Sequence, residues 1–141
     1  MTSFLDRVKD ERSLEALTGL ARPAFNNLLE EFIPCFKKRV RRSRRNAKKR
    51  HQRRAGGGRK SILGSIENQL FFILFYLKDY PTFDVLAFTF GISRSCAAAS
   101  VHRLLPILER AQKNLQVLPK RPSNDPREIR QLVENNRLVR K

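Results

Sequence analysis

The stretch GISRSCAAASVHR, residues 91–103, holds the side chains with the clearest chemistry in this sequence. Arg94 directly follows a serine that can cap a helix, so its guanidinium is expected in the first helical turn. A guanidinium in that place can donate two hydrogen bonds to O6 and N7 of a guanine. Ser95 can bond to a base or a phosphate, whereas Ala98 and Ala99 can only touch a thymine methyl or allow close approach. This chemistry is recognition of a nucleic acid rather than bond breaking.

A helical wheel places Ser95, Ala99 and His102 on one face of this stretch, with Arg103 at its edge. The opposite face is an apolar stripe, formed by Ala97, Val101, Leu104 and Leu108. Two plainer interpretations stay open. Ser95 can bond only to the backbone of its own first turn, and we favour reading His102 as a solvated surface histidine.

The residues before this stretch predict a second helix joined to it by a tight turn. Thr82 is a helix cap, and the apolar residues that follow it at helical spacing are Phe83, Leu86, Ala87 and Phe90. Gly91 can adopt a positive φ in the turn, and Ser93 caps the next helix. Two helices joined in this way form a DNA-binding motif when the second can enter the major groove. The alternative is a plain helical hairpin. Thr82 and Ser93 are included among the candidate DNA contacts.

The rest of the chain also predicts helices and no strand. Short helical pieces are expected over residues 3–19, with Ser13 as a cap and Gly19 as an interruption. A longer helix follows, with an apolar stripe over residues 25–33 that Pro34 should kink or break. Ser65 caps a helix over residues 66–78 that is apolar nearly all round and must be covered by neighbours. Pro106 should kink or break the helix after the turn.

The predicted fold class is therefore all-α: a small helical bundle with a helix-turn-helix, preceded by an N-terminal helical segment and a basic arm. We expect four parts along the chain. These are an N-terminal helical segment (1–36), a basic arm with a glycine hinge (37–60), the helix-turn-helix domain (61–118), and a linker with a short C-terminal helix (119–141).

The charge of the chain calls for a polyanionic partner. There are 30 Lys and Arg against 13 Asp and Glu, a net charge of +17. The densest run, residues 37–60, is too polar to bury a core face and is expected to be a solvated arm or a helix extension. We favour phosphate contact over base reading for its cations, namely Arg41, Arg42, Arg44, Arg45, Lys48, Lys49, Arg50, Arg53 and Arg54. Arg59 and Lys60 follow three glycines and can equally contact phosphates or reach an adjacent groove. A solubilising tail or a nonspecific nucleic-acid tether is the simpler alternative for the arm.

Metals, cofactors and membrane spans are not expected. Cys35 and Cys96 are far apart in sequence and lie at no ligand spacing from the two histidines, so we expect free, buried thiols in a cytoplasmic protein. The longest apolar run, Leu70–Leu77, is too short to cross a bilayer. The GGGRK stretch lacks the spacing of a nucleotide-binding P-loop.

The run GGGRKSILGSIENQLFFILFYLKDYPTFDVLAFTFGISRSCAAASVHRLLPILE, residues 56–109, resembles the N-terminal helix-turn-helix region of DDE-superfamily insertion-sequence transposases, in the insertion-sequence family numbered five. The blocks GGGRK, YPTFDVLAFTFGIS and VHRLLP are similar to its signatures, and the resemblance covers roughly residues 14–121. It implies binding of double-stranded DNA at terminal repeats by this leader. It also implies that a catalytic RNase H-like domain would normally follow. The sequence departs from the family where relatives commonly have polar or bulky residues, at Ala98, Ala99 and Ser100.

We expect no catalysis from the chain itself. Three metal-binding carboxylates would need strands to present them, and the acidic residues here have capping or surface positions. The chain is then the first frame of a split transposase or a truncated copy, with a separately encoded catalytic chain and a homodimer as candidate partners. Two alternatives remain: a stand-alone helix-turn-helix regulator or nucleoid-type DNA binder, and an RNA-binding protein that uses the arginine-rich arm.

Overall fold

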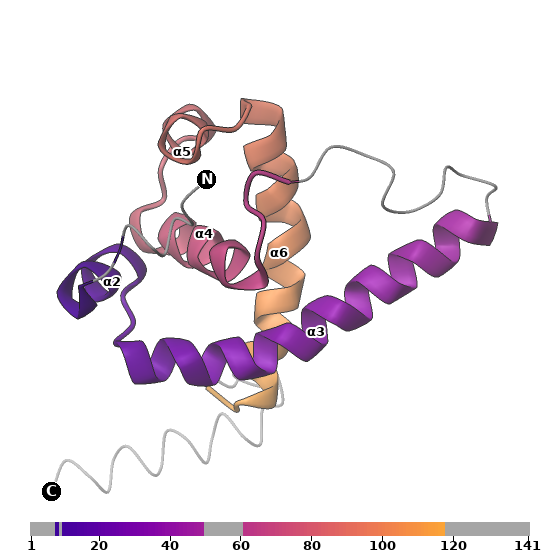
Figure 1. The fold of residues 1–141 in the computed structure, drawn as a ribbon, viewed down its shortest axis with the longest axis horizontal. Helices are drawn as coiled ribbons and strands as arrows, with labels where there is room; N and C mark the ends of the chain where they lie inside the picture. The colour runs from indigo at the N-terminus through magenta and orange to yellow at the C-terminus, as the bar shows by residue number, and fades with distance from the viewer. Residues whose placement is uncertain (1–7, 9, 50–60, 118–141) are drawn as a thin grey trace, which may run out of the picture.

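The computed structural model describes residues 8, 10–49 and 61–117, and for residues 47–49 it describes only the backbone. These residues form five helices and no strand, which confirms the predicted all-α fold class (Figure 1). The helices are α2 (Glu11–Thr18), α3 (Arg22–Lys49), α4 (Ile66–Asp79), α5 (Phe83–Phe90) and α6 (Arg94–Asn114). The expected C-terminal helix, the glycine hinge and residues 3–7 lie outside the described part.

Helix α2 begins one turn earlier than the predicted Ser13 cap. Asp10 precedes the helix, and its carbonyl accepts the Leu14 N–H at 3.1 Å, so Ser13 lies inside the helix. The end is as expected. Gly19 has φ of 74°, and its N–H donates to the Glu15 carbonyl at 2.8 Å. Glycine enters this left-handed region without the steric cost that a Cβ brings.

Helix α3 carries the predicted apolar stripe and then continues well beyond it. Phe25, Leu28, Leu29 and Phe32 are buried. Pro34 lies within the helix and does not break it, and Figure 1 shows that α3 changes direction along its length. A proline inside a helix removes one hydrogen bond but leaves the following turns intact, which explains a kink without a break. The first half of the basic run is therefore a helix extension.

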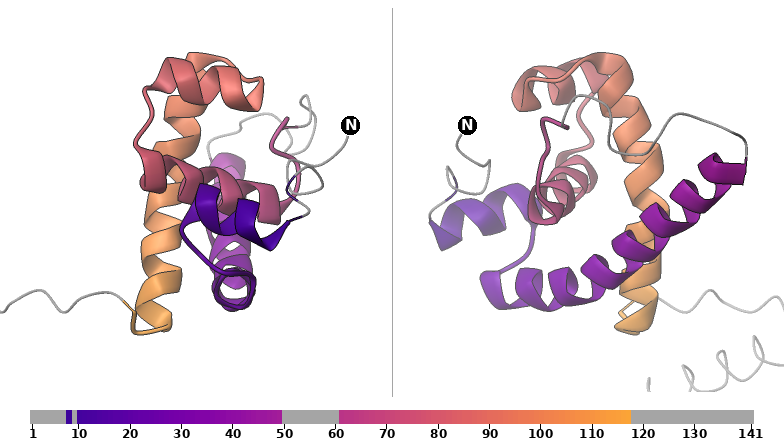
Figure 2. Two further views of the ribbon diagram at one scale, coloured as in Figure 1. Left: turned by 90° about the vertical axis from the view of Figure 1, so that its left-hand side faces the viewer. Right: turned by 45° about the vertical axis from the view of Figure 1, so that its right-hand side comes forward.

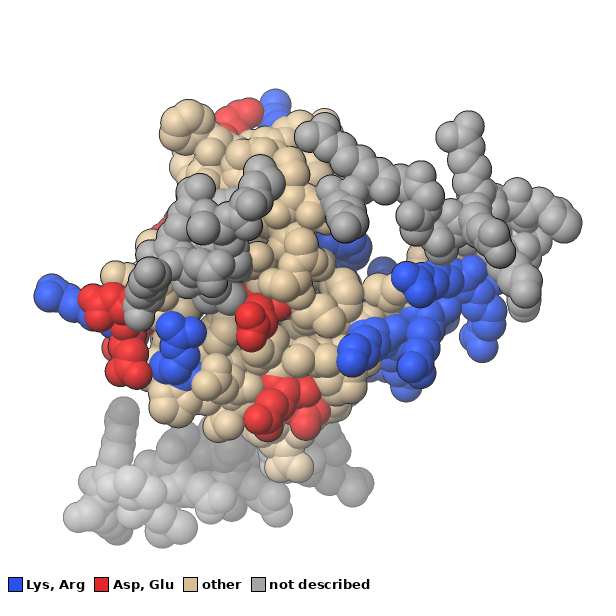
Figure 3. Space-filling view, in the orientation of Figure 1, with Lys and Arg blue, Asp and Glu red and all other residues tan. Residues whose placement is uncertain are grey.

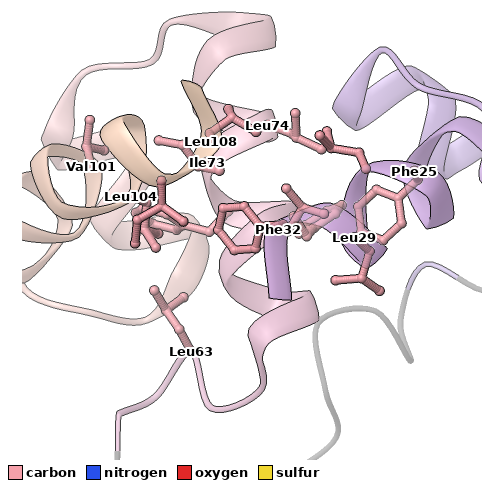
Figure 4. Packing of buried hydrophobic residues seen from close by; sticks show 14 of the residues in the cluster. Phe25, Leu29, Phe32, Leu63, Ile73, Leu74, Val101, Leu104 and Leu108 are labelled. Carbon is pink, nitrogen blue, oxygen red and sulfur yellow. The ribbon is translucent and has the colours of Figure 1, made fainter. Parts of the chain in front are cut away.

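Helix α4 is the centre of the core. Its residues 68–74 are buried, as its apolar composition predicted, because α2, α3 and α6 all pack against it. Figure 4 shows Phe32 of α3, Ile73 and Leu74 of α4, and Leu104 of α6 in one cluster. Full burial of one such side chain stabilises the fold by about 1.5–3 kcal/mol. The helix-turn-helix and the N-terminal helices thus share one core.

Helix α6 runs unbroken through Pro106, so the predicted break is absent. Its buried face includes the predicted Ala97, Val101, Leu104 and Leu108, and adds Ser100. No helix among the described residues is long and apolar enough to cross a membrane.

Candidate nucleic-acid interface

The turn between α5 and α6 has the geometry of a tight helix-turn-helix corner. Gly91 has φ of 64° and its N–H donates to the Phe88 carbonyl at 3.3 Å. The Ile92 N–H donates to the Ala87 carbonyl at 3.0 Å. This pair of bonds is a Schellman motif, in which a left-handed residue reverses the chain and satisfies the last carbonyls of a helix. The apolar Ile92 side chain then packs against the core. The role predicted for Gly91 is confirmed.

Both helices of the motif begin at the predicted caps. The Thr82 hydroxyl accepts the Val85 N–H at 3.3 Å, and the Ser93 hydroxyl accepts the Cys96 N–H at 3.2 Å. A hydroxyl that accepts such a bond can still donate its own proton to a phosphate oxygen. Figure 2 shows α5 beside the start of α6, at the end of α6 that lies away from α3. The two capped N-termini flank the surface that the sequence analysis singled out.

An aromatic cluster fixes α5 on α4. The Phe90 ring lies 4.9 Å from the Phe72 ring at an interplanar angle of 73° and 5.5 Å from the Phe75 ring at 74°. These are edge-to-face contacts, which add about 0.5–1.5 kcal/mol each beyond area burial. Because Phe90 immediately precedes Gly91, the cluster also fixes where the turn begins and where α6 leaves it.

The outward face of the first turns of α6 matches the helical-wheel prediction. Ser95, Ala99 and His102 are exposed, while Ala98 is half-buried at the margin. The His102 ring centroid lies 6.5 Å from that of Phe83 on α5, so the imidazole lies against the neighbouring helix. The polar side chains of this surface are Arg94, Ser95 and His102, and Ala98 and Ala99 between them carry no hydrogen-bonding group.

Arg94 forms an ion pair with Asp84, a residue that was not among the predicted site residues. Its Nε lies 3.6 Å from Oδ1 of Asp84 in the first turn of α5, and both side chains are 70% exposed. Exposed pairs of this kind contribute about 0.2–1 kcal/mol. A base or phosphate can therefore displace the carboxylate at little cost. The two residues lie in different helices, so the periodicity within either helix does not pair them.

Arg103 is held by α4 rather than lying free at the edge of the face. Its Nη2 donates to Oε1 of Gln69 at 3.1 Å. Gln69 is buried, and its Nε2 donates to the Gly64 carbonyl at 3.5 Å. The bond connects α6 to the start of α4, so this guanidinium supports the position of the reading helix. The bond leaves no local sign in the sequence because its two partners are 34 residues apart.

The cations of the predicted arm are only partly within the described residues. Arg41, Arg42, Arg44 and Arg45 are exposed on the C-terminal half of α3. Figure 3 shows Lys and Arg gathered there, whereas the visible face over α5 and the start of α6 is largely free of them. Lys48 and Lys49 lie in α3 without described side chains. Arg50, Arg53, Arg54, Arg59 and Lys60 lie outside the described residues.

Other chemistries find little support in the described part of the chain. No group of three or more His, Cys, Asp or Glu residues there could hold a metal ion. Glu11, Glu67 and Asp84 lie in first turns of helices, where the helix dipole favours a carboxylate. Cys35 is a buried free thiol as expected, but Cys96 is exposed, because it lies on the outer side of α6 away from the Ala97 stripe.

Comparison with known proteins agrees with this geometry. Residues 62–113 match the family model for the helix-turn-helix of DDE superfamily endonuclease. No curated protein and no solved structure matches the chain. The matched span begins just before the Ser65 cap and ends in the last turn of α6, so it contains α4, α5 and nearly all of α6. Residues 62–113 are therefore similar to the helix-turn-helix of DDE superfamily endonucleases, over the span where the sequence resemblance was noted.

Proposed function

We propose that this chain binds double-stranded DNA through α5 and α6, as the terminal-repeat-binding leader of a transposase. The observation that carries the proposal is the coincidence of two findings over residues 62–113. They contain a capped helix-turn-helix with its Schellman turn, and they match the helix-turn-helix model of the DDE superfamily. In such motifs the second helix lies in the major groove with its N-terminal residues at the base edges.

The dimensions of α6 suit this role. Residues 94–102 span about 12 Å at 1.5 Å per residue, which equals the width of the major groove, about 12 Å. Arg94 at the start of this segment donates to a guanine, and Ser95 to a base or a phosphate. Ala99 brings the backbone close to the groove floor. With so few polar groups on this face, the proposal includes only modest sequence preference.

The cations of α3 supply most of the affinity. Each phosphate contact releases counterions, so the dissociation constant rises steeply with salt. Arg41, Arg44 and Arg45 are exposed on α3, away from the turn, and contact backbone instead of base edges. Strand cleavage is proposed to come from a DDE catalytic domain that acts together with this leader, as the similarity of residues 62–113 to DDE superfamily endonucleases implies.

The experiment that tests this proposal is fluorescence anisotropy of the whole chain with a DNA duplex and with an RNA duplex of the same sequence. The proposal expects tighter binding to DNA, because the deep and narrow major groove of RNA excludes a helix. Equal or tighter binding to RNA would instead favour recognition through the arginine-rich segment alone. Ser93→Pro removes the hydroxyl that caps α6, whereas Ser95→Ala removes the hydroxyl proposed to contact DNA. Comparing the affinity of each single variant with that of the double variant separates a structural effect on the cap from loss of a contact.

A further inference from the structure

A basic groove lies on the surface where α3 crosses the C-terminal half of α6. Four cations line it: Lys38, Arg39 and Arg42 from α3, and Arg110 from α6. Its floor is Cys35, Pro106 and Ile107, and both Cys35 and Ile107 are buried. Only Arg42 among the four was a candidate DNA contact from the sequence. The α6 residues that line the groove lie in the half of that helix away from the turn, where Figure 1 shows α3 crossing α6.

Helical periodicity explains why these residues meet. Cys35, Lys38, Arg39 and Arg42 stand at i, i+3, i+4 and i+7 of α3, so they share one face. Ile107 and Arg110 stand at i and i+3 of α6. The crossing of the two helices brings the faces together, with the small thiol of Cys35 and the Ile107 side chain as the buried floor. The four charged side chains are left exposed around it.

The cations of this groove have no anionic partner within the described part of the chain. The one ion pair there joins Arg94 and Asp84, and no hydrogen bond joins any of the four to another described residue. The acidic residue one turn before Cys35 is Glu31, whose Oε2 accepts from Asn114 Nδ2 at 3.3 Å. Asn114 also donates to the Cys35 Sγ at 3.7 Å, so this end of the α3–α6 contact is joined by neutral groups. Like charges at helical spacing repel each other, so a bound anion would relieve a cost already present.

We propose that this groove binds a phosphate of the DNA backbone and thereby fixes the register of α6 on the duplex. The inference rests on the proposed function and adds a site to it. Arg110 is 16 residues beyond Arg94, about 24 Å along the helix axis. The base-reading segment occupies only the first half of that length, so Arg110 lies beyond the major groove of the DNA, over the flanking phosphate backbone. Planar guanidinium groups bind phosphate oxygens through paired, charge-assisted hydrogen bonds.

The site links the two proposed sources of DNA-binding energy, the cations of α3 and the base-reading residues of α6. One phosphate held between α3 and α6 anchors the basic half of α3 and the reading helix to the same strand. A contact of this kind carries no sequence information but determines which base pairs lie under Arg94. The groove therefore acts as a register clamp, unlike the cations farther along α3, which add charge without fixing a position.

The test is a comparison of two charge-matched double variants of the full chain. The groove variant is Arg42→Gln with Arg110→Gln, and the control is Lys37→Gln with Lys113→Gln. Each removes two exposed cations, one from α3 and one from α6, and the control residues do not line the groove. Far-UV circular dichroism and urea unfolding establish that both variants are folded. Dissociation constants for one mixed-sequence duplex are then measured over a series of salt concentrations.

We expect the groove variant to bind about tenfold more weakly at physiological salt, and the control about threefold or less. The slope of the logarithm of the binding constant against the logarithm of the salt concentration reports the number of phosphate contacts. Because the two arginines share one phosphate, the magnitude of this slope should fall by about one, and not by two, in the groove variant. Each single variant, Arg42→Gln or Arg110→Gln, should lose nearly as much affinity as the double variant. The clamp would be overturned by equal losses of affinity in the groove and control variants, or by a loss in the double groove variant equal to the product of the two single losses. Either result would leave the proposed DNA binding itself standing. Failure of the wild-type chain to bind duplex DNA would overturn both proposals.

Discussion

Nε of Arg94 lies 3.6 Å from Oδ1 of Asp84, so the first arginine of α6 rests against the first turn of α5. The carboxylate holds the guanidinium near the position from which it can enter the major groove. It also places a negative charge next to the surface that would meet DNA phosphates. Asp84 is therefore expected to orient Arg94 and to lower the affinity of the protein for unrelated DNA.

Asp84→Asn should raise affinity for unrelated duplex DNA by about two- to fivefold, since one repulsive charge at the interface is removed. The ratio of affinities between a preferred and an unrelated site should fall, because Arg94 loses its orientation. Competition anisotropy with the two duplexes measures both quantities. Glu109→Gln, which removes a carboxylate from the other half of α6, is the matched control. An unchanged affinity ratio would show that Asp84 does not position Arg94.

Arg94→Ala should reduce discrimination between sites by about 1–3 kcal/mol, the value of a bidentate arginine–guanine contact. Affinity for unrelated DNA should fall much less. The reverse is expected for Arg41→Ala with Arg44→Ala and Arg45→Ala, whose cations contact phosphates and should affect all sequences alike. Equal losses of Arg94→Ala on both duplexes would contradict a base-reading role.

Gly91→Ala should destabilise the fold by about 1–2 kcal/mol through backbone strain in the left-handed region. An added Cβ at Gly91 meets no atom within 4 Å, so no steric clash contributes. Gly64→Ala is the control, since Gly64 also has a positive φ of 56° and open space around it. Urea unfolding should give similar losses for both variants, while DNA binding should weaken for Gly91→Ala alone. Equal effects on binding would indicate that the turn does not determine the position of α6.

Phe90→Ala should lower the free energy of unfolding by about 3–5 kcal/mol, because it leaves a cavity among the rings that hold α5 on α4. Phe88 lies two residues earlier but is 90% exposed. Phe88→Ala should change stability by less than about 0.5 kcal/mol. Thermal or urea unfolding of the two variants measures the difference. A similar loss for both would mean that the aromatic cluster does not anchor the motif.

The local features of the helix-turn-helix could be predicted from the sequence because each depends on neighbouring residues. A serine or threonine cap bonds to an N–H three residues later, as at Ser65, Thr82 and Ser93. The reversal at Gly91 depends on the absence of a Cβ at one residue. The apolar stripes of α3 and α6 follow from helical periodicity alone.

Other features depend on contacts between distant segments and left no local signal. Pro34 predicts a kink or a break, but α3 contacts α6 on both sides of it, through Glu31 with Asn114 and around Arg42 and Arg110, which favours a continuous helix. The Arg103–Gln69 bond and the groove formed by Arg42 and Arg110 exist only once the helices cross. Periodicity shows which residues share a face but not which helix that face will meet.

The most direct test of the central claim is a methylation-interference footprint of the whole chain on the DNA that flanks its gene, where the proposed function requires terminal repeats. Methylation at guanine N7 blocks the acceptor that an arginine reads in the major groove. We predict protection confined to the repeats, with interference at a guanine that disappears in Arg94→Ala while protection of the backbone persists. Protection spread evenly over repeat and unrelated DNA, with no guanine whose methylation matters, would contradict recognition of the repeats by α6.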